Sequence, residues 1–175
     1  IISGGENISS PEIEDCLFGV DLAQSSHNVV RRNRIRSKDL PLGVRGDGIR
    51  LWYSRHNEIT DNVLSQVRDM VVWYSGQNRI LRNRVEDSRY ALHFMYSERN
   101  DVEDNVYDDN MVGIFLMYSD GVRIRRNRIV RSQGATGMGV GFKESSNVVL
   151  EDNVILYCAK GLYLDISPYE PDTHN

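Results

Sequence analysis

The chain has 175 residues, a formal net charge of −4 and a pI of about 5.6. This length suits one domain with a continuous core, and we expect a single domain over residues 1–175. The acidic balance gives no electrostatic reason to expect a nucleic-acid partner. No apolar stretch approaches the ~20 residues of a membrane span, and no signal peptide opens the sequence.

One short pattern recurs along the chain: alternating apolar residues end in Ser, an Asn follows three positions later, and a second Asn comes after five more. The clearest copies are Trp52-Tyr53-Ser54…Asn57…Asn62, Trp73-Tyr74-Ser75…Asn78…Asn83 and Met95-Tyr96-Ser97…Asn100…Asn105. The second Asn recurs in steps of 29, 21, 22, 22 and 26, at Asn33, Asn62, Asn83, Asn105, Asn127 and Asn153. A period near 22 with short period-2 runs and no helical pattern is typical of a β-solenoid.

Taken in chain order, the repeats predict seven strand-bearing coils, which start near Gly19, Gly48, Asp69, Ala91, Gly113, Gly139 and Gly161. The two long steps are explained by insertions at 37–46 and 133–137, which should bulge from the stack and leave the register intact. The predicted fold is all-β: a right-handed parallel β-helix of about seven turns of roughly 22 residues. Neither end resembles a cap, so we expect an uncapped fragment of a longer protein.

Two columns of residues predict the core. Aligning each coil on its Ser gives one apolar column of Val20, Ile49, Met70, Leu92, Ile114, Val140 and Leu162. Two positions later the aligned residues are Leu22, Leu51, Val72, Phe94, Leu116, Phe142 and Leu164. Because residues two apart share one face of a strand, both columns should point inward.

Other columns predict the corners. A small residue precedes the first core column in every coil except the one that carries Asp69, which suits a tight corner. The Asn residues suit turns because Asn tolerates left-handed backbone angles, and stacked Asn side chains can bond along the axis. Cys16 and Cys158 occupy one column about 29 Å apart, too far for a disulfide, and we expect both to be small buried corner residues. Arginines beside the Asn positions indicate a solvated turn surface or, as the less favoured interpretation, a surface for an anionic partner.

The outward positions between the core columns are the candidate site. One outward column contains Val71, His93 and Phe115, and the other contains Trp52, Trp73, Met95 and Met117 in consecutive coils. Such an exposed apolar patch is typical of a binding surface. It suits a covering segment or partner, carbohydrate stacking on the two Trp residues, or a soft-metal site, because thioether and imidazole donors suit Cu(I).

Two further sets of residues receive structural interpretations. Tyr53, Tyr74, Tyr96 and Tyr118 precede the Ser of four coils, and their parity predicts inward rings that stack at a corner with hydroxyls near water. Asp108 and Asp109 are adjacent, but no acid or base partner stands opposite them on the Trp and Met face. A glycosidase would need two converging carboxylates.

Two runs of residues carry a resemblance to a known family. The run Tyr90-Ala91-Leu92-His93-Phe94-Met95-Tyr96-Ser97, followed by Met117-Tyr118-Ser119, closely resembles the NosD family, and so does the run from Gly161 to Pro171. The resemblance implies a periplasmic, non-catalytic accessory protein for copper-centre assembly in nitrous oxide reductase. It also implies an ATP-binding-cassette (ABC) transporter and a copper chaperone as partners.

The sequence prediction is therefore a copper-binding assembly factor that holds Cu(I) transiently through His93, Met95 and Met117. Trp52, Trp73 and Phe115 are the predicted interface residues. The alternatives are a carbohydrate-binding or polysaccharide-degrading β-helix protein and a pure interaction scaffold.

Overall fold

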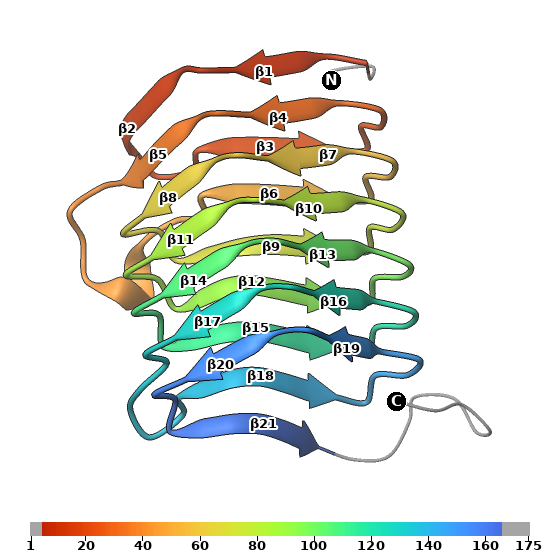
Figure 1. Cartoon of the computed structure of the whole chain (residues 1–175). Helices are drawn as coiled ribbons and strands as arrows, with labels where there is room; N and C mark the ends of the chain where they lie inside the picture. The colour runs from red at the N-terminus through yellow and green to blue at the C-terminus, as the bar shows by residue number, and fades with distance from the viewer. Residues whose placement is uncertain (1–4, 166–175) are drawn as a thin grey trace.

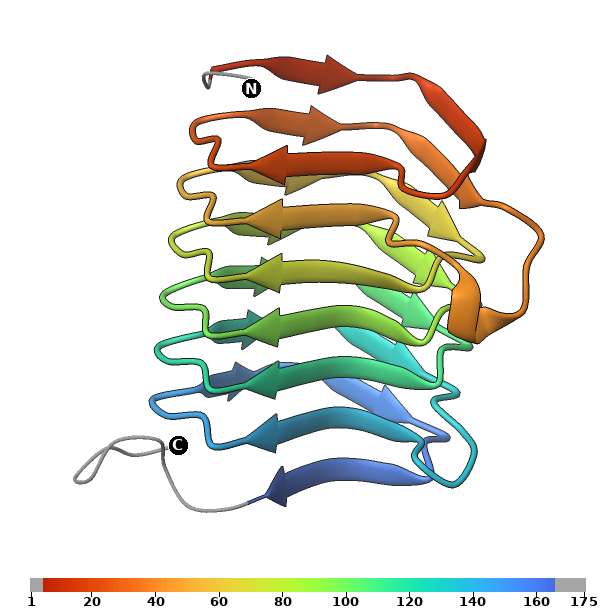
Figure 2. The same ribbon diagram turned by 180° about the vertical axis from the view of Figure 1, so that it is seen from behind.

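In the computed structural model, which describes residues 5–165, the chain winds into a parallel β-helix of three sheets with seven strands each (Figures 1 and 2). The coils advance with a right-handed turn from the N-terminal to the C-terminal end. The predicted all-β solenoid is confirmed. Within the described residues, no helix has the length and apolarity that a membrane crossing requires.

Each coil contributes one strand to each sheet, and every strand pair is parallel. Sheet A contains β1 (Asn7–Ser9), β4 (Val29–Arg31), β7 (Glu58–Thr60), β10 (Arg79–Leu81), β13 (Asp101–Glu103), β16 (Arg123–Arg125) and β19 (Val149–Glu151). Sheet B contains β2 (Glu12–Cys16), β5 (Arg34–Ser37), β8 (Val63–Ser65), β11 (Arg84–Glu86), β14 (Val106–Asp108), β17 (Arg128–Val130) and β20 (Val154–Leu156). Sheet C contains β3 (Val20–Ala23), β6 (Ile49–Trp52), β9 (Asp69–Trp73), β12 (Tyr90–Met95), β15 (Val112–Met117), β18 (Met138–Lys143) and β21 (Lys160–Asp165).

The two predicted apolar columns form the inner face of sheet C. Leu92 pairs in register with Ile114, and Phe94 pairs with Leu116. From β6 to β15 every member of both columns is at most 1% exposed. In the last described coil, Leu162 and Leu164 are 54% and 60% exposed, because no further described strand lies against β21.

Stacked Asn side chains hold the coils in register. In the ladder between sheets A and B, the backbone N–H and the Nδ2 of Asn62 both donate to Asn83 Oδ1, at 3.0 and 2.9 Å. The Nδ2 of Asn62 also donates to the Val30 carbonyl oxygen at 2.9 Å. Buried polar groups need such partners, so the predicted axial bonding is confirmed.

The prediction of left-handed Asn residues is wrong for the stacked Asn side chains. In these ladders the positive φ angle belongs to the residue before each Asn, such as Asp61 (57°) and Arg82 (53°), whereas Asn147, which is not a ladder residue, is itself left-handed (51°). An Asn that bonds inward along the axis cannot also form the outward turn, so the preceding exposed or half-buried residue takes the left-handed conformation.

Glycine residues at the corner between sheets B and C allow successive coils to approach each other closely. A Cβ on Gly113 would lie 2.4 Å from both the Gly139 carbonyl oxygen and Ile129 Cγ2. The predicted need for small residues in this column is confirmed as close approach between coils. The two cysteines are free, but Cys16 is exposed and Cys158 half-buried, which corrects the prediction that both are buried. Cys16 lies in the first coil, where β2 has a strand on one side only.

The two predicted insertions leave the stack without breaking it. The loop at 37–46 protrudes from the corner between β5 and β6 and includes the short 3₁₀ helix η1 (Leu42–Val44) (Figure 1). Arg45 fastens this loop, since its Nε donates to the Leu40 carbonyl oxygen at 2.8 Å and its guanidinium reaches Asp87.

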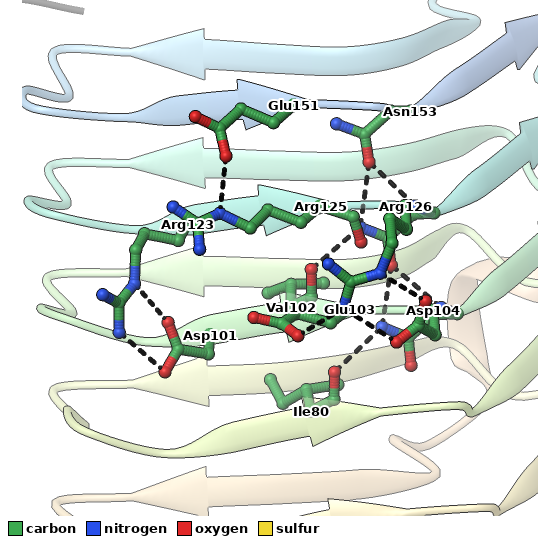
Figure 3. A network of polar contacts seen from close by, with 12 residues as sticks. Ile80, Asp101, Val102, Glu103, Asp104, Arg123, Arg125, Arg126, Glu151 and Asn153 are labelled. Atoms are coloured by element: carbon green, nitrogen blue, oxygen red, sulfur yellow. Dashed lines mark hydrogen bonds and ion pairs between the residues drawn. The ribbon is translucent and has the colours of Figure 1, made fainter.

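Ion pairs between coils cover the outer faces of sheets A and B. Arg126 contacts Asp104 and Glu103 of the preceding coil, and Arg125 contacts Glu151 of the next one (Figure 3). Arg82 contacts Asp61 in the same way at 2.8 Å. Arg82, Arg125 and Arg126 are therefore partnered by carboxylates of the chain itself, which favours the structural interpretation of these side chains.

Candidate functional site

The strand register brings the predicted site residues together on the outer face of sheet C. Met95 of β12 is the register partner of both Trp73 in β9 and Met117 in β15, and Trp73 pairs with Trp52 in β6. His93 pairs with Phe115 in the neighbouring outward column. The predicted vertical file of Trp52, Trp73, Met95 and Met117 is thus present.

This face is less exposed than the alternation of residues suggested. His93 is 8% exposed and Val71 is 5% exposed, while Trp52, Trp73, Met95, Met117 and Phe115 are half-buried. Large side chains that stand about 4.8 Å apart in adjacent coils cover one another. The expectation of an openly exposed patch is corrected to a partly enclosed one.

His93 and Met117, which lie in adjacent coils, are in direct side-chain contact. His93 Nε2 lies 3.4 Å from Met117 Sδ. The tautomer of the imidazole decides whether this nitrogen donates a proton to the sulfur or presents a lone pair beside it. A nitrogen donor and a sulfur donor are therefore already adjacent on a scaffold whose register is fixed.

Burial keeps the His93 imidazole neutral. Desolvation lowers its pKa to about 4, and the positive charges of Arg89 and Arg68 act in the same direction, whereas Asp69 opposes them. A neutral imidazole is the form that binds metal ions.

A buried ion pair of Asp69 and Arg89 lies at the N-terminal ends of the sheet C strands and is linked to His93 through Tyr90. Asp69 is 1% exposed, and both of its carboxylate oxygens accept hydrogen bonds from Arg89. Arg89 lies over the ring of Tyr90, and Tyr90 lies against His93 with a centroid distance of 4.6 Å. Sequence reasoning assigned no role to Arg89 and Tyr90; the only signal was Asp69, the single large residue in a column of Gly and Ala.

The predicted interface residues lie on two sides of the histidine and methionine pair. Trp52 and Trp73 meet edge to face at 4.6 Å, and Trp73 Nε1 is buried with no hydrogen-bond partner among the described residues. Phe115 lies 6.1 Å from His93. The ring of Phe115 and Met138 Sδ occupy the space beside Gly141, where a Cβ would lie 2.5 Å from each.

The tyrosine column stacks, but outside the core. Adjacent rings of Tyr53, Tyr74, Tyr96 and Tyr118 are 4.8 to 5.0 Å apart with interplanar angles of 6° to 12°. All four residues have φ between 48° and 50°, and Tyr53 is 50% exposed. The left-handed turn reverses the parity on which the inward prediction rested, so that prediction is wrong while the stacking is confirmed.

A hollow also lies over sheet B, away from the histidine and methionine pair. It has a volume of about 410 Å³ and is lined by acidic side chains, including Glu86 and Asp108, and by Arg36, Arg84 and Arg131. Glu86 pairs with Arg84 at 2.9 Å, and Asp108 pairs with Arg131. Sequence reasoning found no acid or base partner for Asp108 on the Trp and Met face and did not predict this cleft over sheet B.

Residues 5–165 contain no group of three or more His, Cys, Asp or Glu side chains that could hold a metal ion. Sites that need three or four such ligands already in place, as structural zinc sites do, are therefore not preformed in this part of the chain. The His93 and Met117 pair belongs to a different chemistry, because thioethers are soft ligands.

Comparisons with known proteins agree with the fold. The model of a family described as "Periplasmic copper-binding protein (NosD)" matches residues 37–175. A double mutant of the periplasmic alginate epimerase AlgG has a similar structure, with a TM-score of 0.73, 19% identity and coverage of 94% of this chain. This chain spans 39% of the AlgG chain.

A candidate glycosyl hydrolase from Parabacteroides merdae is also similar, with a TM-score of 0.57 and 11% identity over 78% of this chain and 77% of that one. At these identities the likeness shows the fold alone. A comparison with curated proteins finds no match.

Proposed function

Since the chain belongs to the NosD family of periplasmic copper-binding proteins, we propose that it holds Cu(I) transiently for assembly of the copper centre of nitrous oxide reductase. His93 and Met117 supply the two central donors, and Met95, in the same strand as His93, supplies a third donor and second thioether. The observation that carries this proposal is the 3.4 Å contact between His93 Nε2 and Met117 Sδ.

The donor pair fits a soft monovalent ion. Typical metal–nitrogen and metal–sulfur distances of about 2.0 and 2.3 Å sum to more than the separation of the two atoms, so one ion can contact both. Both ligands are neutral, and Arg89 and Arg68 add positive charge nearby. This environment favours Cu(I) over a divalent ion, which would carry twice the charge and prefers harder ligands.

The surrounding aromatic side chains suit transfer. Trp52, Trp73 and Phe115 are half-buried, so they limit access of water and leave apolar surface for a docking protein. We assign the partners as a copper chaperone that delivers the ion and an ABC transporter of the same maturation system, with the periplasm as the location. The family description supports the periplasmic location and copper binding, and the protein is an accessory factor in this scheme.

A Cu(I) competition titration with a chromogenic chelator tests the site. The double variant Met95→Ala/Met117→Ala should lose at least about tenfold in affinity, as the loss of metal-site contacts commonly does. Met138→Leu is the matched control, because Met138 lies on the same face beside Phe115 and should leave the affinity unchanged. Equal affinity in the double variant and the parent would reject this site.

The cleft over sheet B supports a second candidate function, carbohydrate binding. Arginine and carboxylate side chains that line one groove can donate to and accept from sugar hydroxyls. The carboxylates Glu86 and Asp108 are held in ion pairs, which favours binding over hydrolysis. Glycan-array binding that Arg84→Ala and Arg131→Ala abolish would support this candidate, and a parent chain that binds no glycan would exclude it.

A further inference from the structure

Two histidines far from the copper face form a pair of their own. His27 and His56 occupy the same position in successive coils, in the turn that joins sheet C to sheet A. Both have left-handed backbones, with φ of 62° and 56°, and both side chains are exposed. The turn therefore directs the two imidazoles away from the core on the same side.

The Asn ladder beneath this turn fixes the spacing of the two residues. Asn28 and Asn57 directly follow the histidines, and the Asn28 backbone N–H and Nδ2 donate to Asn57 Oδ1 at 2.9 and 2.8 Å. The imidazole rings stack with centroids 5.1 Å apart and an interplanar angle of 10°. The rings are thus parallel and close, and the hydrogen bonds between Asn28 and Asn57 hold the two turns in register.

A hollow beside the rings provides further donors. It has a volume of about 340 Å³, and its lining includes His27, His56, Glu58, Gln77 and Arg79. Glu58 is paired with Arg79 at 2.9 Å. Gln77 follows the two histidines in the same column, since it precedes Asn78 as His56 precedes Asn57, and its φ is 57°.

We propose that His27 and His56 form a second metal site, which chelates a divalent, imidazole-preferring cation such as Zn²⁺ or Cu²⁺. Imidazole suits these ions, and metal–nitrogen distances of about 2.0 Å require the two nitrogens to come within about 4 Å of each other. The exposed imidazoles leave the stacked arrangement when they bind, so that one nitrogen of each ring points to the same ion. Glu58 supplies a nearby carboxylate, and Arg79 restrains it.

This site differs from the copper face in chemistry and place. It uses nitrogen and oxygen donors at an exposed turn, whereas His93 and Met117 are a soft pair on sheet C. It does not depend on the proposed Cu(I) function, and either site can fail without affecting the other.

Zn²⁺ calorimetry and electron paramagnetic resonance of the Cu²⁺-loaded protein test the proposal. The parent should carry His174→Ala, which removes the one histidine outside the described residues. We expect one ion per chain and a Cu²⁺ spectrum with hyperfine coupling to two imidazole nitrogens. His27→Gln and His56→Gln should each weaken Zn²⁺ binding by about 100-fold, because the intramolecular advantage of two linked donors is lost.

Two gain-of-affinity variants sharpen the test. Gln77→His extends the column to three imidazoles, and Arg79→Gln releases Glu58 and removes a positive charge. Each should raise the Zn²⁺ affinity by about tenfold. Unchanged binding in His56→Gln, or a Cu²⁺ spectrum with a single nitrogen, would overturn the proposal, and circular dichroism verifies that each variant stays folded.

Discussion

His93 Nε2 and Met117 Sδ lie 3.4 Å apart although the two residues are separated by 24 positions in the sequence. His93 pairs in register with Phe115, so Met117 is its diagonal neighbour on the adjacent strand. Diagonal neighbours on one face are within reach of long side chains. A one-residue slip between β12 and β15 would turn one side chain of the pair to the other face.

Copper binding should be insensitive to mild acid. A proton competes with copper for His93 only near its lowered pKa of about 4, and thioethers do not titrate. The Cu(I) affinity should therefore stay constant between pH 8 and pH 5, whereas an ordinary histidine with a pKa of about 6.5 would lose about 30-fold at pH 5. Competition titrations across this range measure the difference, and a 30-fold loss at pH 5 would show that His93 is not buried as described.

The stability of the fold should fall in acid because of the same side chain. The folded-state pKa of about 4 lies below the ordinary histidine pKa of 6.5, so between these pH values the unfolded chain binds more protons than the folded one. Stability is then full above pH 6.5 and decreases as the pH falls to 4, by about 3 kcal/mol in total.

Urea titrations at pH 7, 5 and 4 measure this loss, and His93→Leu is the control. That variant should lack this part of the acid dependence. Parallel pH dependences of the parent and His93→Leu would contradict the assignment.

Close packing at the corner between sheets B and C should make Gly113 intolerant of substitution. A Cβ on Gly113 would stand 2.4 Å from backbone of the next coil, whereas a Cβ on Gly161 would meet nothing within 4 Å. Gly113→Ala should lower the free energy of unfolding by about 1–3 kcal/mol, as overpacking does. Gly161→Ala is the matched control and should be nearly neutral; equal effects in urea titrations would argue against the described contact between coils.

The Asn ladder should matter more for stability than the ion pairs outside it. Asn83→Ala leaves the Asn62 backbone N–H without the acceptor it uses in the interior, which should cost about 1–3 kcal/mol. Arg82→Gln breaks the exposed pair with Asp61 and should cost at most about 1 kcal/mol. The reverse order in thermal or urea unfolding would indicate that the surface pairs set the register.

The architecture could be predicted because every coil places apolar residues at the same positions in the core. A core column such as Ile49, Met70 and Leu92 is visible in the sequence once the coils are aligned, and parity along a strand then indicates which residues point inward. Parity fails at the turns. Tyr74 and Tyr96 follow their strands directly, but φ angles of 48° and 49° rotate them outward, and such angles are not encoded in hydrophobic alternation.

The sequence indicates which site residues share a column, but it does not indicate how deeply His93 is buried or which side chains surround it. Register places Met95, Met117 and His93 on one face, which the period alone indicates. The burial of His93 depends on Tyr90, whose position involves an irregular register between β9 and β12, and on the ion cluster of Arg89 and Asp69. The pair His27 and His56 escaped notice because two exposed turn residues carry no periodic apolar signal.

We propose above that one Cu(I) ion binds between His93 Nε2 and Met117 Sδ. X-ray absorption at the copper edge of the Cu(I)-loaded protein is the decisive experiment for this site, because it identifies the ligand atoms. We expect at least one sulfur scatterer at about 2.3 Å and one imidazole nitrogen at about 2.0 Å. The sulfur contribution should be reduced in Met117→Leu, and the imidazole contribution should be lost in His93→Leu. A spectrum without sulfur, or one that neither variant changes, would contradict it.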